Sequence, residues 1–108
     1  MIHAKKRYIL VYSEVGYFED KELMKTMKAR IIDLYGAIGL QSINLKIMMI
    51  KPNYLIVRCN HGRVDDLLFI MSSMKFKNSA LLPLRVSGTM KKLKSIISDF
   101  SQTIFFQL

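Results

Sequence analysis

The sequence contains few of the side chains that disulfides and metal centres require. It has one cysteine, Cys59, and only two histidines, His3 and His61. A single cysteine excludes an intramolecular disulfide, and tetrahedral zinc sites usually need several Cys or His ligands. We therefore expect that this chain itself binds no metal ion or other cofactor.

Long apolar segments are also missing. No uncharged apolar run approaches the ~18 residues that a transmembrane helix needs. The first residues carry His3, Lys5, Lys6 and Arg7, and they lack the apolar stretch of a secretory signal. We expect no membrane partner and an intracellular protein. Its location would be cytoplasmic, since the short chain favours a prokaryote-like cell, or nuclear and nucleolar in a eukaryote.

Acidic residues are scarce relative to basic ones. The 108 residues include 17 Lys and Arg but only 8 Asp and Glu, which gives a formal net charge of +9 at pH 7. Because 51% of the residues are hydrophobic, the chain does not resemble a disordered basic tail. The length suits one compact domain over residues 1–108. So large a charge on a small folded domain indicates a polyanionic partner such as nucleic acid.

Apolar spacing predicts seven helices and strands. Alternating or β-branched runs indicate strands, and a period of 3.6 residues indicates helices. In chain order these are a strand over 8–12, a helix over 20–38 that ends at Gly36 or Gly39, strands over 42–49 and 54–60, a helix after Asn60, a strand over 81–86, and a helix that begins at 87–89. Residues 103–108 are expected to form a short apolar tail.

The order β-α-β-β-α-β-α is typical of an α+β fold, the ferredoxin-like (RRM-like) split βαβ sandwich. It predicts a four-stranded antiparallel sheet of order 4-1-3-2, numbered along the chain, with an extra C-terminal helix. Pro83 removes a backbone donor from the fourth strand, so this strand should lie at an edge of the sheet. The predicted order puts it there.

This topology would bring seven basic residues to one edge. The fourth strand runs antiparallel to the first, so its end lies beside the start of the first. The seven residues are Lys5, Lys6, Arg7, Arg85, Lys91, Lys92 and Lys94. Ser87, Gly88 and Thr89 begin the last helix, where unpaired backbone N–H groups favour an anion. We interpret this edge as an RNA or DNA backbone site; the alternative is an ordinary helix cap with a solvated lysine face.

The strand over 54–60 ends in Arg58, Cys59 and Asn60, followed by His61, and we expect this segment at the opposite end of the sheet. Arg58 and His61 could donate to a phosphate or a base edge. Alternatively, Cys59 packs as a small hydrophobe, Asn60 caps the next helix, and His61 is exposed. A Cys59–His61 nucleophile pair is disfavoured, because neighbours at a strand end point to different faces.

Several large apolar residues do not face the predicted core. Ile32 and Phe69 project away from the apolar stripes of their helices, and Phe105 and Phe106 lie in the tail. Isolated exposed apolar residues are normal. Together, these four indicate a protein interface, either with a different chain or with a second copy of this one.

Two separated motifs resemble those of the ribonuclease P protein component 2 family, which archaeal and eukaryotic ribonuclease P share. The first is Leu-Ile-Val-Arg-Cys-Asn-His at 55–61, followed by Val64 and Asp65. The second is Val-Ser-Gly-Thr-Met-Lys-Lys at 86–92. The segments at 6–9 and 35–39 are also similar, and the order and spacing agree over residues 5–97.

The resemblance implies a protein subunit of an endoribonuclease that removes the 5′ leader from precursor tRNA. It implies that this chain is non-catalytic and that the RNA carries the Mg²⁺-dependent chemistry. The implied partners are ribonuclease P RNA, precursor tRNA in the complex, and ribonuclease P protein component 3. The motif positions fall on Arg58, Asn60, His61, Ser87, Gly88, Thr89, Lys91 and Lys92.

Two other classes of function are compatible with the sequence. One is a stand-alone nuclease that uses His61 with Asp65 or Asp66, although the helix dipole is sufficient to explain both aspartates. It predicts cleavage by the protein without RNA. The other is a small ferredoxin-like regulatory module that binds a ligand and dimerises. It predicts indifference to RNA, which the charge of +9 disfavours.

Overall fold

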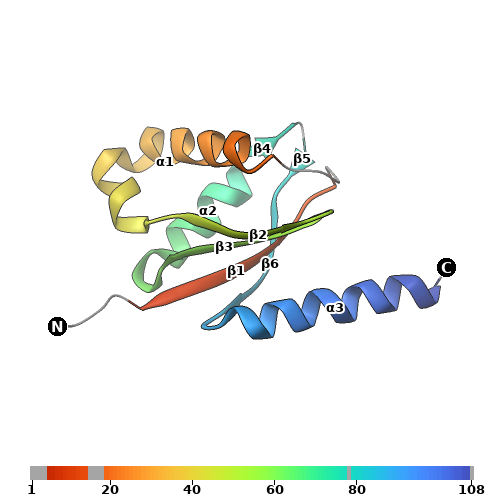
Figure 1. The fold of residues 1–108 in the computed structure, drawn as a ribbon. Helices are drawn as coiled ribbons and strands as arrows, with labels where there is room; N and C mark the ends of the chain where they lie inside the picture. The colour runs from red at the N-terminus through yellow and green to blue at the C-terminus, as the bar shows by residue number, and fades with distance from the viewer. Residues whose placement is uncertain (1–4, 15–18, 78, 108) are drawn as a thin grey trace.

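The computed structural model describes residues 5–14, 19–77 and 79–107, with all of their side chains except those of residues 20 and 100–107. The elements in chain order are β1 (Lys6–Tyr12), α1 (Asp20–Ile43), β2 (Lys46–Lys51), β3 (Tyr54–Asn60), the 3-10 turn η1 (His61–Arg63), α2 (Val64–Ser73), β4 (Lys75–Phe76), β5 (Ser79–Ala80), β6 (Leu82–Ser87) and α3 (Met90–Gln107). Helices α1 and α2 cover one face of the main sheet, and α3 crosses the other (Figure 1).

The main sheet is antiparallel and has the order β2-β3-β1-β6. Since β6 is the fourth strand in the predicted count, this is the predicted order 4-1-3-2, and the α+β, ferredoxin-like fold is confirmed. Pro83 lies in the edge strand β6 opposite Val11, where the register shifts between Leu10 and Val11. At an edge, the N–H group that proline lacks does not interrupt hydrogen bonding between two inner strands. The short strands β4 and β5, which the sequence analysis did not predict, pair with each other.

Side chains of β1 and β3 alternate between the two faces of the sheet. Ile9 and Val57 are fully buried toward α1 and α2, while their neighbours Leu10 and Ile56 are fully buried toward α3. Both faces are therefore covered, which explains why the central strands are almost continuously apolar. Each such side chain contributes roughly 1.5–3 kcal/mol through its removal from water.

The ends of three elements differ from the prediction. Helix α1 ends at neither Gly36 nor Gly39. Gly36 has φ 75° and forms a kink, after which the helix resumes and continues to Ile43, with Asn44 as its C-cap in the left-handed conformation. Strand β2 consequently begins at Lys46. Helix α3 continues to Gln107, so most of the expected tail is helical, because no Gly or Pro follows Gly88 to end the helix. The side chains of Phe105 and Phe106 lie outside the described residues.

Candidate nucleic-acid interface

Four strand ends meet at one end of the sheet. The start of β1 lies beside the ends of β3 and β6, with Lys6 opposite Asn60 and Tyr8 opposite Ser87. Strand β2 also starts here, with Lys46 opposite Arg58. We call this region the basic end. Its residues are Lys5, Lys6, Arg7, Lys46, Arg58, Asn60, His61, Ser87, Gly88, Thr89, Lys91 and Lys92.

The predicted position of Arg58 and His61 at the opposite end of the sheet is wrong. Strand β1 is antiparallel to both of its neighbours, so the ends of both neighbours must lie beside its start. The backbone N–H of His61 donates to the carbonyl of Lys5 at 2.8 Å, which extends this pairing beyond the strands. The two family motifs, separated along the chain, therefore lie on either side of the first residues of β1.

Asn60 connects three elements at the basic end. The Nζ of Lys6 donates to Oδ1 of Asn60 at 2.6 Å, and Nδ2 of Asn60 donates to the carbonyl of Ser42 at 2.8 Å. Asn60 precedes η1 but makes no side-chain capping bond to it, so the expectation that it caps the following helix is wrong. Its amide positions the Lys6 ammonium without neutralising it, because an amide carries no charge.

Arg7 lies beside the turn that leads into α3. Its Nη1 donates to the carbonyl of Lys6 at 3.1 Å. A Cβ atom added at Gly88 would lie 3.5 Å from the same nitrogen, an ordinary van der Waals contact, which places the guanidinium beside the backbone of this turn. The N–H of Thr89 donates to Oγ of Ser87 at 3.2 Å. The positive end of the α3 dipole adds to the charge of Arg7 at this turn.

The cations of the basic end are not neutralised by acidic partners. Within the described ranges, ion pairs join Arg63 to Asp66 and Lys77 to Glu22, and none involves a lysine or arginine of the basic end. The Nε atom of Arg58 is buried and has no hydrogen-bond partner among the described residues. The charges of the basic end are therefore not neutralised by any acidic side chain that the structure describes, although a buried atom such as Nε of Arg58 is not itself accessible to an external anion.

Two of the seven predicted edge residues do not join this cluster. Lys94 lines a cavity of about 700 Å³ with Lys51 and Tyr54, next to the turn between β2 and β3. Each residue of α3 advances ~1.5 Å along the helix axis, which carries Lys94 away from the start of the helix. Arg85 is exposed in the middle of β6, opposite Leu10.

Lys46 belongs to the basic end although the sequence analysis did not select it. It is the first residue of β2 and lies opposite Arg58. The available signal was the hairpin itself. Because β2 and β3 are joined by a short turn, the residue that begins one strand must lie beside the residues that end the other.

Neither Cys59 nor Asp66 is suited to a stand-alone nuclease. Burial raises the pKa of the Cys59 thiol to about 11, against a smaller opposing effect of the Lys6 charge, so the thiol is protonated at neutral pH. Oδ2 of Asp66 lies 2.9 Å from Nε of Arg63, so this carboxylate is already engaged, whereas His61 is exposed. The described part of the chain also contains no cluster of three or more His, Cys, Asp or Glu suited to a metal ion.

Two of the four predicted apolar surface residues, Ile32 and Phe69, are exposed, and the side chains of the other two lie outside the described residues. Ile32 on α1 has 47% of its surface exposed, and Phe69 on α2 has 57%. Strand β6 adds Leu82, Leu84 and Val86, which the sequence analysis did not select. A role for Ile32, Phe69, Phe105 and Phe106 in a protein interface stays a prediction.

Comparison with known proteins now identifies the family. The model of the Rpp14/Pop5 family matches residues 7–98. The chain belongs to the Rpp14/Pop5 family of ribonuclease P protein subunits. The matched residues include both sequence motifs and all of the basic end except Lys5 and Lys6. The resemblance inferred from the motifs is therefore confirmed.

A solved structure shares the fold of this family member. A chain in the cryo-EM structure of yeast ribonuclease MRP superposes with a TM-score of 0.65, over 96% of this chain and 97% of that one. The two sequences are 11% identical, so the likeness concerns the fold alone. The search of curated proteins finds no match.

Among the described residues, no helix is long and apolar enough to span a bilayer.

Proposed function

We propose that this chain assists the RNA of ribonuclease P in removing the 5′ leader from precursor tRNA, and that it performs no cleavage itself. The basic end is the observation that carries the proposal. It combines cations that have no acidic partner among the described residues with the backbone N–H groups at the start of α3, beside which the Arg7 guanidinium lies. Family membership supports a ribonucleoprotein context for this charge.

The basic end would act by reducing repulsion between RNA phosphates. Lysine and arginine side chains that contact phosphates displace condensed counterions, which makes the affinity strongly dependent on salt. An RNA region that folds only when its strands approach closely is stabilised by such a contact. In this proposal the Mg²⁺ ions that support cleavage are held by the RNA, and the precursor tRNA is bound by the assembled complex.

The proposed protein partner is ribonuclease P protein component 3. Exposed apolar side chains on α2 and β6, such as Phe69 and Leu84, offer surface for a protein contact away from the basic end. The match to a chain of yeast ribonuclease MRP supports a place among other subunits. A cytoplasmic location stays a prediction.

The decisive experiment is to isolate the chain from its own cells and to sequence the RNA that accompanies it. We expect one structured RNA, and we expect the isolate to cleave precursor tRNA at the 5′ leader with Mg²⁺. Removal of the RNA should abolish cleavage. Isolation without RNA, or cleavage by the protein alone, would refute the proposal and favour the ligand-binding or nuclease alternative, respectively.

A second experiment tests the basic end as the site of contact. The variant Lys91→Ala/Lys92→Ala should bind the co-isolated RNA more weakly, and the log–log slope of affinity against salt should flatten by roughly 0.7–0.9 per lost phosphate contact. The control Lys51→Ala/Lys75→Ala makes the same change in charge outside the basic end. Equal slopes for the two variants would show that only the net charge matters.

A further inference from the structure

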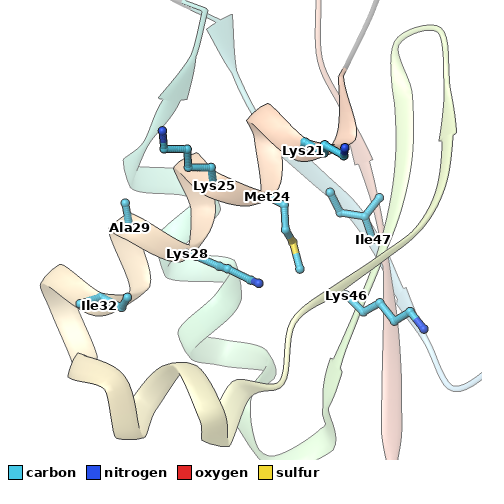
Figure 2. A pocket seen from close by; sticks show the side chains of 8 residues that line it. All are labelled: Lys21, Met24, Lys25, Lys28, Ala29, Ile32, Lys46 and Ile47. Atoms are coloured by element: carbon cyan, nitrogen blue, oxygen red, sulfur yellow. The ribbon is translucent and has the colours of Figure 1, made fainter.

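A groove of about 650 Å³ runs between α1 and the edge strand β2, separate from the turn at the start of α3. Figure 2 shows that Met24 and Lys28 extend from α1 toward β2, and that Ile47 extends from β2 toward α1. Lys46 borders the groove, but its chain extends away from α1. The charge that faces the groove therefore comes mainly from the helix.

The floor of the groove is apolar and deformable. Met24 and Ile47 pack partly against the core, and Ile32 is 47% exposed at the groove wall. Methionine has three rotatable bonds, so Met24 can adjust to side chains of different shape. The groove thus offers an apolar surface of the kind that receives alternate side chains of a bound peptide.

The rim of the groove is positively charged. Lys21, Lys25 and Lys28 follow one another along α1, and no Asp or Glu lines the groove among the described residues. Neither Lys25 nor Lys28 forms an ion pair in the described part of the chain. The aliphatic stems of these lysines add to the apolar wall, while their ammonium groups stay in water.

We propose that this groove binds an extended acidic segment of another protein, in which apolar and acidic side chains alternate. Laid along the groove, the segment would turn its apolar side chains toward Met24 and Ile47. Its carboxylates would face outward, where the ammonium groups of the rim lie in water; of these, Lys28 extends toward β2 and Lys25 extends away from it. The proposal concerns a protein contact only and does not depend on the proposed role in ribonuclease P.

The lining favours a protein segment over RNA. Single-stranded RNA is bound by aromatic rings or arginine planes that stack on bases, and the described residues that line the groove include neither. The lysines of the rim suit phosphates as well as carboxylates, but the apolar floor has no partner in a sugar–phosphate backbone, whereas it complements a peptide that is apolar on one face and acidic on the other.

The test uses the full chain and three labelled peptides: alternating leucine and glutamate, alternating leucine and glutamine, and glutamate alone. We expect measurable binding of the leucine–glutamate peptide and at least about tenfold weaker binding of the other two. The methyl NMR signal of Met24 should shift on binding. Absence of binding, or binding that leaves Met24 unchanged, would overturn the proposal.

Charge and apolar contact are then tested by matched variants. Lys25→Glu/Lys28→Glu should weaken binding by about tenfold or more, while Lys51→Glu/Lys75→Glu, with the same net charge, should change it less than about twofold. Ile32→Asp should weaken binding more than Ile38→Asp, which alters a residue 83% exposed on the same helix and outside the groove. Each variant is checked for native circular dichroism.

Binding of polyuridylate tests whether the groove is an RNA site and not a peptide site. If it binds the native chain, and if Lys25→Glu/Lys28→Glu weakens its binding while the leucine–glutamate peptide does not bind, the groove is an RNA site and the proposal is overturned. Equal effects of the groove and control variants on the peptide would also overturn it. Lys91→Ala/Lys92→Ala should lose RNA binding and keep peptide binding, because it alters the basic end and not the groove.

Discussion

The two faces of the sheet are buried to very different extents. Among the side chains that the structure describes, the cluster on the α1–α2 side of the sheet has 16 buried residues and the cluster on the α3 side has four, namely Leu10, Ile56, Leu93 and Ile97. The first face therefore supplies most of the packing that holds the domain together. The second face holds the helix whose start completes the basic end, so changes there should alter the site before they unfold the protein.

Adjacent residues of β1 give the sharpest test of this difference. Ile9 faces α1 and α2, Leu10 faces α3, and both side chains are fully buried. We expect Ile9→Ala to lower the free energy of unfolding by about 4 kcal/mol and Leu10→Ala by about 2–3 kcal/mol, because a single helix can shift to fill part of the cavity. Urea unfolding of both variants measures the difference. Equal losses would mean that the two faces contribute alike.

The next largest effect on stability is expected for the substitution Asn60→Ala. Asn60→Ala removes an acceptor from Lys6 and a donor from the carbonyl of Ser42, at a cost of about 1–2 kcal/mol. It should also weaken RNA binding, because the Lys6 ammonium loses its fixed position. Asn60→Asp serves as the control, since it retains the acceptor but adds a negative charge. If Asn60→Ala leaves both stability and affinity unchanged, these bonds do not organise the basic end.

The smallest expected effect is a pH dependence that resides on the α1–α2 face. Burial raises the pKa of Cys59 from its ordinary value of 9.0 to about 11. Above pH 9.0 the unfolded thiol ionises while the folded thiol keeps its proton, so the stability contributed by this group falls as the pH rises toward about 11. Unfolding curves should show a smaller loss for Cys59→Ala over this range. If the native chain and Cys59→Ala lose stability equally over this pH range, the Cys59 thiol is not protected from water in the folded protein.

Local sequence patterns were sufficient to predict the main helices and strands and their order in the sheet. The β-branched and aromatic run of β1 and the apolar spacing of α2 reflect which side chains are buried, and Pro83 marks an edge strand for a reason that is independent of the rest of the fold. Gly36 misled the prediction of the end of α1. A glycine with positive φ usually ends a helix, but here the chain regains helical geometry after the kink and continues to Ile43.

The candidate site was predictable only in part. The first residues of β1 and the start of α3 were correctly brought together, because their proximity follows from one antiparallel strand pair. Arg58 and His61 were assigned to the wrong end although the predicted antiparallel order already puts the end of β3 beside the start of β1, and Lys46 was not selected although the β2–β3 hairpin places it opposite Arg58. Lys94 was misplaced since its position depends on the path of α3 across the sheet.

The amino-acid sequence by itself determined the excess of positive charge, the alternation that makes strands, and the two motifs that mark the family. These properties are local or additive, so they can be read without coordinates. Only the tertiary structure decided which charges are neighbours and which carboxylates neutralise them. That outcome depends on strand register and on the direction in which a helix crosses the sheet, because residues far apart in the chain meet only after both are set.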